Sequence, residues 1–287
     1  MTRKYKVAGT GFHISLADES PLWGGLLNYK PFEVADCEAV FKLEIGVEID
    51  ICGKVPYYVE TPEKGMPLIE VFRVGDDWLF EMSPVSTIEK CVWMRCNSDF
   101  SKASLYYDKY GLFAVNNALM ILFSCCTAGR DTLEMHSSVV TKDGLGYMFL
   151  GKSGTGKSTH SSLWMKNIPG AVLLNDDNPV IHITDSGEIR VYGSPWSGKT
   201  PCYRNMDVPI GAIVRIEQAP YNKIHRLPVI EAYASIISST SAFRPVEKIA
   251  DAVHLTIEKV VSSIPCYTLQ CLPDNEAALV CFSEVTR

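Results

Sequence analysis

The chain has 287 residues, enough for two domains or one large one. Hydrophobic residues make up 47% and charged residues 21%, which is the composition of a globular rather than a disordered protein. Its 27 Lys and Arg and 33 Asp and Glu leave a net charge of −6, so the chain is a poor candidate for non-specific binding to nucleic acid or to anionic membranes. We expect neither nucleic acid nor a membrane as a partner, although a local basic pocket for phosphate is compatible with this charge.

The ten cysteines do not follow a disulfide or zinc pattern. Cys125 and Cys126 are adjacent within an apolar stretch, and no two CxxC pairs occur at zinc spacing. The first ten residues carry charges without the apolar block of a signal peptide. The longest apolar run, residues 111–126, is too short to span a bilayer and contains two asparagines. These features predict a cytoplasmic protein with reduced thiols.

The chain changes character near residue 105. Short runs rich in β-branched and aromatic residues, separated by turn residues, predict a β-rich N-terminal domain over residues 1–105. The strands expected there are residues 5–16, 39–51, 68–74, 78–82 and 91–97. A helical pattern over residues 109–127 then opens a second domain, residues 106–287.

A glycine-rich motif dominates the second domain. An apolar strand, residues 147–150, follows the expected strand 133–141 after a short turn, so the two should be antiparallel. The next residues, Gly151-Lys-Ser-Gly-Thr-Gly-Lys-Ser-Thr159, satisfy the P-loop pattern G-x-x-x-x-G-K-[ST]. A helical segment, residues 157–167, comes directly after it. A strand before the motif and a helix after it are the context that this pattern requires, so we predict a nucleotide site.

Each residue type in this motif has a physical reason. Glycines allow backbone N–H groups to converge on phosphate oxygens, and a helix that begins at Lys157 directs its positive dipole end to the anion. Lys157 would reach the β- and γ-phosphates, and Ser158 would ligate Mg²⁺. We therefore expect ATP, or another nucleoside triphosphate, with Mg²⁺. The expected nucleotide-binding residues are Gly151, Ser153, Gly154, Thr155, Gly156, Lys157, Ser158 and Thr159.

Two carboxylates follow at the end of a short apolar strand, residues 171–174. Asp176 and Asp177 are adjacent there, and two such charges are costly to bring together unless a cation offsets them. With a P-loop in the same domain, we predict that Asp176, Asp177 and Ser158 bind the metal and that one of the two aspartates is left to act as a base. The alternative is a solvated turn, because Asp-Asp-Asn-Pro is also favourable turn chemistry.

The residues around the motif resemble a known nucleotide core. Strands 180–184 and 188–192 form a second hairpin, so the P-loop lies between antiparallel hairpins rather than in a repeated βαβ sheet. Met135-His-Ser-Ser138, the P-loop and Leu174-Asn-Asp-Asp177 resemble the core shared by HPr kinase/phosphorylase and ATP-dependent phosphoenolpyruvate carboxykinase. The resemblance covers about residues 130–285. It implies an α/β (α+β) fold with a mixed sheet, and a histidine, here His136, beside the two carboxylates.

The two families differ in chemistry. Carboxykinases are nearly twice this length and carry a lysine pair and an arginine near the histidine, whereas residues 130–135 contain no lysine, which disfavours decarboxylation. HPr kinases carry a glycine- and arginine-rich segment after the core, and residues 193–204 depart from it. In this departing segment, Lys199 and Arg204 could meet phosphoryl charge and Trp196 could contact an acceptor or a base. An ordinary surface loop is the equally favoured alternative.

The resemblance implies an HPr-kinase-like phosphotransferase whose substrate is unassigned. We expect an ATP-dependent kinase that transfers the γ-phosphate to a hydroxyl, of a serine in a peptide or protein or of a small metabolite. Asp176, Asp177, His136 and Lys157 are the expected catalytic residues. The alternatives are a nucleotide-binding switch that transfers no phosphate, and a small carboxykinase-like lyase. HPr kinases also suggest a homo-oligomer.

His136 is the residue that distinguishes this core from other P-loop proteins. Alternation along the expected strand 133–141 places His136, Ser138 and Val140 on one face. We therefore expect His136 within a few ångströms of Ser158 or of the aspartate pair. The alternative is a half-buried histidine whose partner is Ser138 or the backbone. The remaining expected elements are strands 210–217, 223–227 and 266–271 and helices 229–239, 246–262 and 275–282.

Overall fold

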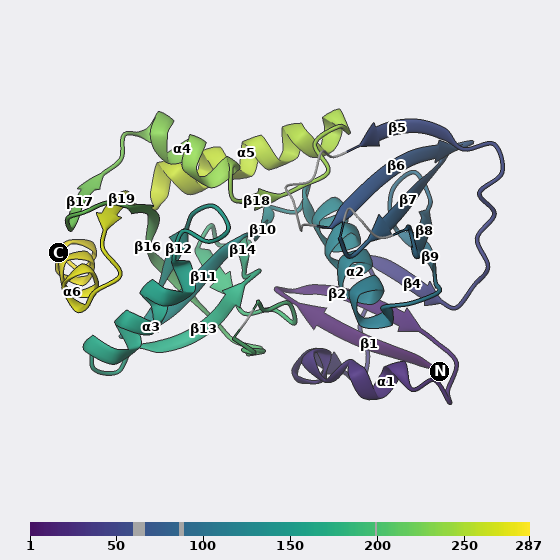
Figure 1. The fold of residues 1–287 in the computed structure, drawn as a ribbon, viewed down its shortest axis with the longest axis horizontal. Coiled ribbons are helices and arrows are strands. Elements are labelled where there is room, and N and C mark those ends of the chain that lie inside the picture. Colours follow the sequence, from purple (N-terminus) through teal and green to yellow (C-terminus); the bar gives the residue numbers. More distant parts are fainter. Residues whose placement is uncertain (60–66, 86–88, 199) are drawn as a thin grey trace. The chain divides into compact units, whose positions relative to one another are not determined.

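The computed structural model describes residues 1–59, 67–85, 89–198 and 200–287. The chain divides into two compact units, Met1–Cys126 and Thr127–Arg287 (Figure 1). Each unit contains a large mixed β-sheet, so the expected α/β class holds at the level of secondary structure. In these described residues, no helix combines the length and the apolar character needed to cross a bilayer.

The first unit contains a nine-stranded sheet in the part of the chain that the structure describes. The strand order is β3-β1-β2-β4-β9-β8-β7-β6-β5, and only the β2–β4 and β4–β9 pairs are parallel. The strands are β1 (Thr2–Val7), β2 (Thr10–Ser15), β3 (Glu33–Val34), β4 (Phe41–Ile45), β5 (Val55–Val59), β6 (Leu68–Val74), β7 (Asp77–Ser83), β8 (Val92–Cys96) and β9 (Lys102–Tyr107). Two short helical segments, α1 (Leu22–Gly25) and η1 (Leu27–Phe32), lie between β2 and β3.

The sequence pattern predicted some of these strands and missed others. The expected strand 5–16 is a hairpin, because Ala8 and Gly9 adopt φ of 45° and 79°, as a tight two-residue turn between strands requires. β5 and β9 were missed. β5 is exposed at every position and contains Pro56, so it lacks the alternation by which a half-buried strand is identified.

Helix α2 (Gly111–Thr127) differs from expectation in the unit to which it belongs. We expected it to open the second domain at residue 106, whereas the two units divide after Cys126. The physical reason is its packing within the first unit. Tyr29 Oη donates to Asn116 Oδ1 at 2.7 Å, and Cys126 Sγ donates to the Phe100 carbonyl at 3.3 Å. These long-range contacts are invisible to a local pattern.

The second unit contains a ten-stranded mixed sheet in its described residues. Its longest strand, β16 (Asp207–Gln218), pairs in parallel with β12 and β19 and in antiparallel fashion with β15, and so joins the two halves of the sheet. The other strands are β10 (Thr132–Met135), β11 (Ser137–Lys142), β12 (Leu145–Leu150), β13 (Val172–Asp177), β14 (Val180–Ile183), β15 (Ile189–Tyr192), β17 (Lys223–Arg226), β18 (Thr240–Ser241) and β19 (Cys266–Cys271). The two antiparallel hairpins predicted on either side of the P-loop, β11–β12 and β14–β15, are confirmed.

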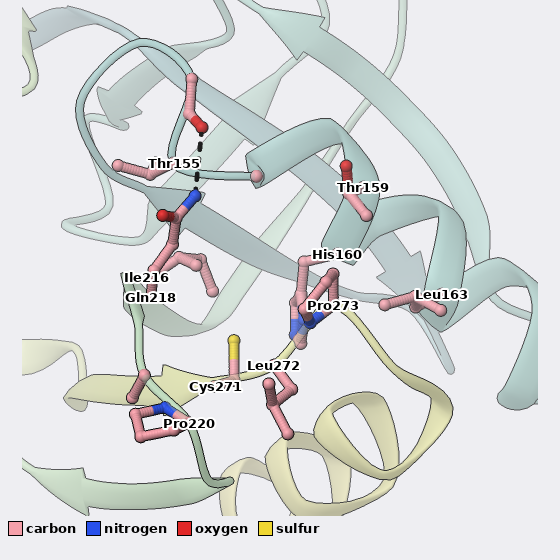
Figure 2. Close-up of a pocket in the computed structure, with 13 residues that line it drawn as sticks. Thr155, Thr159, His160, Leu163, Ile216, Gln218, Pro220, Cys271, Leu272 and Pro273 are labelled. Carbon is pink, nitrogen blue, oxygen red and sulfur yellow. Dashed lines mark hydrogen bonds between the residues drawn. The ribbon is translucent and has the colours of Figure 1, made fainter.

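The helices of this unit are α3 (Lys157–Asn167), α4 (Val229–Ile237), α5 (Glu247–Ser263) and α6 (Asn275–Val285). Helices α4 and α5 pack against each other, and α5 also packs on β10. Helix α3 packs on β11, β12 and α6, and its first turns face the ends of β16 and β19 (Figure 2). Helix α3 and strand β19 have the bounds that the sequence predicts.

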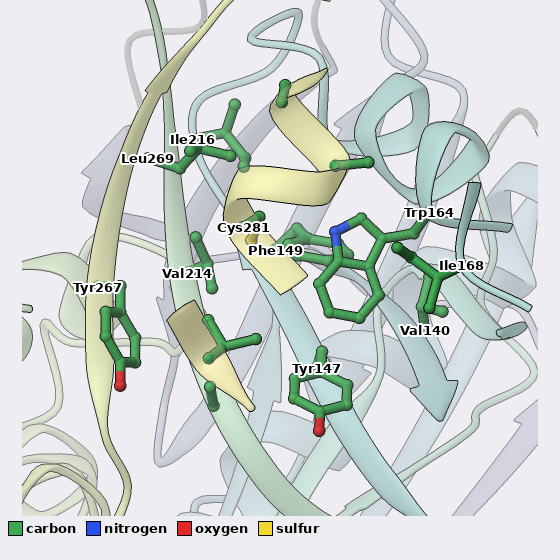
Figure 3. Packing of buried hydrophobic residues seen from close by; sticks show 14 of the residues in the cluster. Val140, Tyr147, Phe149, Trp164, Ile168, Val214, Ile216, Tyr267, Leu269 and Cys281 are labelled. Carbon is green, nitrogen blue, oxygen red and sulfur yellow. The ribbon is translucent and has the colours of Figure 1, made fainter. Parts of the chain in front are cut away.

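Trp164 is the centre of the core beneath α3. Its side chain is fully buried, and its ring centroid lies 5.0 Å from that of Tyr147 and 5.3 Å from that of Phe149 (Figure 3). Phe282 of α6 contacts the same ring edge-on at 5.6 Å. The indole therefore joins α3 and α6 to the strand that precedes the P-loop.

We expect Trp164→Ala to lower the free energy of unfolding by about 3–5 kcal/mol, because it removes a large buried side chain and leaves a cavity. Chemical denaturation followed by circular dichroism measures this loss. The matched control is Met165→Ala on the exposed side of the same helix, which should change stability by less than about 0.5 kcal/mol. Equal effects of the two substitutions would contradict this description of the core.

Candidate functional site

The P-loop segment adopts a backbone that requires its glycines. Strand β12 ends at Leu150, residues 151–156 form the loop, and α3 begins at Lys157. Gly151, Gly154 and Gly156 have φ of 153°, 80° and 106°, a region that L side chains rarely adopt. A Cβ on Gly151 would also lie 2.5 Å from Thr155 Oγ1. The loop thus holds its backbone in one shape at the positive end of a helix, as an anion site requires.

Lys157 is buried at the mouth of this loop. Its Nζ donates to the carbonyls of Gly151 at 2.9 Å and Lys152 at 3.3 Å, and it lies 2.9 Å from His136 Nε2. Burial lowers the pKa of the Lys157 ammonium, and the carboxylates of Asp177 and Asp176 oppose that shift. The loop therefore holds a largely desolvated cation beside the backbone that would bind phosphate.

Strand β13 brings the two aspartates to the same edge of the sheet. Strands β12 and β13 are both antiparallel to β11, which lies between them, so their carboxyl ends point the same way. Ser158 Oγ donates to Asp176 Oδ1 at 2.8 Å. The other oxygen of that carboxylate, Oδ2, is buried and has no hydrogen-bond partner among the described residues. A buried carboxylate oxygen in this state can accept a further ligand.

His136 connects the lysine to the second aspartate. Its Nδ1 lies 3.1 Å from Asp177 Oδ1, so the predicted closeness of His136 to the aspartate pair is confirmed. Because the Lys157 ammonium can only donate, Nε2 accepts from it, and we assign the ring proton to Nδ1, which donates to Asp177. Lys157, His136 and Asp177 thus form a continuous hydrogen-bonded chain.

The strand expected over residues 133–141 is wrong, because the chain is interrupted at His136. Strand β10 before it pairs with β14 and β18, whereas β11 after it pairs with β12 and β13. The chain changes strand partners at this residue, and the His136 N–H donates to the Ser239 carbonyl at 2.6 Å instead of to a ladder partner. Ser138 is buried and bonds Ser161 of α3 at 2.6 Å, so it is not the partner of His136.

Asp177 is held in an unusual backbone conformation. Its φ is 146°, which is uncommon for a residue other than glycine and costs free energy. Neighbouring main chain stabilises it. Asp177 forms a β-bridge with Ser197, and the Gly198 N–H donates to the Asp176 carbonyl at 2.5 Å. A Cβ on Gly198 would lie 3.2 Å from that of Asp177, so a side chain there would press on the carboxylate-bearing residue.

Residues 194–198 hold the Asp-Asp segment in place, and residues 194–196 are buried. Asn175 Nδ2 donates to Ser194 Oγ at 3.2 Å and to the Trp196 carbonyl at 3.1 Å. Ser194 Oγ in turn donates to the Asn178 carbonyl at 2.5 Å. Trp196 is only 3% exposed, so it is a packing residue rather than a contact for an acceptor or a base. Residues 194–196 are therefore buried rather than part of a surface loop, whereas Gly198, Thr200 and Arg204 are exposed.

The sequence also indicated two candidate cations in residues 193–204, Lys199 and Arg204. Lys199 lies outside the described residues. Arg204 is exposed.

Sequence reasoning missed Glu134. This residue is 1% exposed, and both carboxylate oxygens are buried with no hydrogen-bond partner in the described part of the chain. Burial, and then the charge of Asp177, raise the pKa of the Glu134 carboxyl well above its usual value. The available signal was a glutamate between Leu133 and Met135, two residues before His136, in a run that otherwise reads as buried strand.

Ser158, Asp176 and Asp177 are the residues that suit Mg²⁺. No group of three or more His, Cys, Asp or Glu with metal-binding geometry occurs among the residues described. Mg²⁺ in phosphate sites needs only one or two carboxylates, since phosphate and water supply the other ligands. Two neighbouring ligands of an octahedral Mg²⁺ lie about 3 Å apart. The 2.8 Å between Ser158 Oγ and Asp176 Oδ1, and the unpartnered Oδ2, fit that requirement.

We expect Glu134→Gln to make stability less dependent on pH. Because its pKa is raised, Glu134 keeps its proton to higher pH in the folded chain than in the unfolded chain, which releases it above about pH 4.3. The unfolded state then binds fewer protons, so this group's contribution to the free energy of unfolding falls as pH rises. Urea denaturation at about pH 5 and about pH 8, without nucleotide or Mg²⁺, measures the difference. Glu258→Gln, at an exposed position of α5, is the control, and an unchanged pH dependence in Glu134→Gln would contradict the prediction.

No family model matches this chain, and no curated protein matches it. Among solved structures, it is similar to the Hpr(Ser) kinase/phosphatase from Coxiella burnetii, with 11% identity and a TM-score of 0.30 over 53% of this chain and 93% of that chain. A likeness of this size carries no argument about activity. The resemblance to the HPr kinase and carboxykinase core therefore stays a prediction from the motifs.

Proposed function

We propose that the second unit is a nucleotide-dependent phosphotransferase, which transfers the terminal phosphoryl group of a Mg²⁺-bound nucleoside triphosphate to a hydroxyl. The observation that carries this proposal is the convergence of five side chains at one edge of the sheet. Lys157 and Ser158 come from the start of α3, Asp176 and Asp177 from the end of β13, and His136 from the break between β10 and β11. This set combines a cation that can bind phosphate, ligands for a metal ion and a carboxylate that can act as a base.

The nucleotide phosphates would lie on residues 151–159. The backbone N–H groups of the loop and the amino end of α3 supply donors, and Lys157 Nζ supplies the charge. In the present structure that ammonium donates to two loop carbonyls. Phosphate oxygens would offer stronger, charge-assisted acceptors to the same donors. Binding of the anion would therefore offset the unfavourable desolvation of the Lys157 ammonium.

We assign different roles to the two aspartates. Asp176 bonds Ser158 and has an unpartnered buried oxygen, so we assign it with Ser158 to the metal. When bound, Mg²⁺ would offset charge on the phosphates and help to orient them. Asp177 is one-third exposed and contacts His136 rather than Ser158, so we assign it as the base.

The transfer step follows from these roles. Asp177 accepts the proton of the acceptor hydroxyl while that oxygen bonds to the γ-phosphorus, and the bond from the γ-phosphorus to the β,γ-bridging oxygen breaks. The Nδ1–H of His136 orients the Asp177 carboxylate, and the Lys157 ammonium stabilises charge on the transferred group. The acceptor would be a serine of a peptide or protein, or a small hydroxylated metabolite.

We expect Lys157→Ala to weaken nucleotide binding or turnover by at least about 100-fold, because it removes the charge directed at the phosphates. Titration calorimetry with Mg-ATP and a coupled turnover assay measure the loss. Lys166→Ala is the matched control, since Lys166 is exposed near the other end of the same helix. Normal affinity and turnover in Lys157→Ala, with native circular dichroism, would show that the P-loop assignment is wrong.

The two aspartates should separate binding from transfer. We expect Asp176→Asn to weaken Mg-ATP binding by about tenfold or more, because a metal ligand loses its charge. Asp177→Asn should retain Mg-ATP binding and lose transfer by about 100-fold or more, because an amide cannot take the proton. Calorimetry gives the first value, and transfer of labelled phosphate to serine peptides and hydroxylated metabolites gives the second. Normal transfer in both variants would refute both roles.

The same transfer screen tests the alternatives. ATP turnover without any phosphorylated product would favour a nucleotide switch over a kinase. A product that depends on oxaloacetate would favour a carboxykinase-like lyase. Either result would overturn the proposed phosphotransferase while leaving the nucleotide site in place.

A further inference from the structure

A pocket of about 560 Å³ adjoins the P-loop within the second unit (Figure 2). It lies between the first turns of α3, the end of β16 and the segment that follows β19. Gly154 and Gly156 of the loop border it, so it is continuous with the backbone assigned to the phosphates. Its volume falls within the range of roughly 300–1,000 Å³ that is typical of small-molecule sites.

The walls of the pocket are mainly apolar. Leu163 comes from α3, Ile216 and Pro220 come from the end of β16 and the residues after it, and Leu272 and Pro273 follow β19. Leu272 is 39% exposed, so apolar surface faces the opening and not only the floor. Apolar walls with a few fixed polar groups are typical of a site for a flat, mostly apolar ligand such as a nucleobase.

His160 supplies an unpartnered donor at the pocket wall. The Trp164 Nε1–H, which can only donate, bonds His160 Nε2 at 3.1 Å, so Nε2 is the acceptor. With Nε2 as the acceptor, the ring carries its proton on Nδ1, which is therefore a donor. The residue is 2% exposed, and Nδ1 has no hydrogen-bond partner among the residues that the structure describes. Figure 2 shows the His160 side chain leaving α3 toward Pro273 and the pocket.

Gln218 connects the pocket to the P-loop. Its Nε2 donates to the Gly154 carbonyl at 3.4 Å, shown as the dashed line in Figure 2. This contact uses the amide nitrogen and leaves the amide oxygen of Gln218 as an acceptor. His160 and Gln218, which both line the pocket, thus add one donor and one acceptor to its mainly apolar lining. A nucleobase presents ring-nitrogen acceptors and exocyclic donors at its rim, between two apolar faces.

We infer that this pocket binds the base of the nucleotide whose phosphates lie on residues 151–159, and that His160 donates its Nδ1–H to an acceptor atom of that base. This inference rests on the proposed nucleotide site and adds the part that the P-loop motif does not encode. The apolar walls hold the faces of the base, and the paired polar groups orient its rim. The unpartnered donor of His160 is then satisfied only in the complex.

Calorimetry with Mg-ATP, Mg-GTP and Mg-tripolyphosphate on the full chain tests the inference. Tripolyphosphate has the phosphates without the base, so the wild-type chain should bind at least one nucleotide at least tenfold more tightly than tripolyphosphate. Ala219→Trp fills the pocket from a partly exposed position, and Leu272→Trp fills it from an exposed one, so that a folding failure in one leaves the other. Each should weaken nucleotide binding at least tenfold and leave tripolyphosphate binding unchanged.

His160→Met tests the donor separately. The methionine sulfur can weakly accept from Trp164 in place of Nε2 but has no donor, so nucleotide affinity should fall and tripolyphosphate affinity should not. Tyr221→Trp is the control, since Tyr221 is 50% exposed and lies next to the pocket segment without lining it. It should bind both ligands like the wild-type chain.

The outcomes separate the two proposals. Equal wild-type affinity for nucleotide and tripolyphosphate, or unchanged nucleotide affinity in the folded tryptophan variants, would overturn the pocket inference and leave the P-loop in place. Unchanged nucleotide affinity in folded His160→Met would overturn the role of His160. A wild-type chain that binds neither nucleotide nor tripolyphosphate would overturn the proposed function itself, and the pocket inference with it.

Discussion

The parallel alignment of β12 and β13, with β11 antiparallel between them, is the constraint on which the candidate site depends. It places the end of the strand that leads into the glycine loop and the end of the strand that carries Asp176 and Asp177 at one edge of the sheet. Helix α3 connects the two, and the fully buried Trp164 fixes that helix on the sheet. The 2.8 Å contact between Ser158 and Asp176 is a result of this arrangement rather than of any local preference.

The site concentrates polar groups whose burial is unfavourable in the isolated chain. Lys157, Asp176 and Glu134 are each less than 10% exposed, and carboxylate oxygens of Asp176 and Glu134 have no hydrogen-bond partner among the described residues. Desolvated, incompletely paired charges of this kind are characteristic of sites that bind a charged ligand. Asp177 adds backbone strain. The segment 194–198, held by Asn175 and Ser194, provides the packing and main-chain bonds that keep these residues in place.

The break at His136 shows how a single interruption of a strand can create a site. In a continuous strand over residues 133–141, the backbone of His136 would be hydrogen-bonded to a neighbouring strand. The chain instead passes from the β10 pairing to the β11 pairing at this residue. The imidazole thereby bridges Lys157 and Asp177, two residues that lie on different elements. Its position between a cation and a carboxylate assigns the tautomer, because the lysine can only donate.

Local chemistry was enough to predict much of this unit. The glycine spacing and the following helix, the antiparallel hairpins and the bounds of α3 and β19 all depend on neighbours in the sequence: turn residues, apolar alternation and the φ that only glycine adopts freely.

Only the tertiary structure decided the rest. Helix α2 belongs to the first unit because of Tyr29 and Phe100, distant residues with which it bonds. The roles of Asp176 and Asp177 could not be separated from the sequence, because adjacent carboxylates look alike until one lies beside Ser158 and the other beside His136. Glu134 and the pocket beside His160 depend on burial and on the meeting of β16, β19 and α3, which no local pattern encodes.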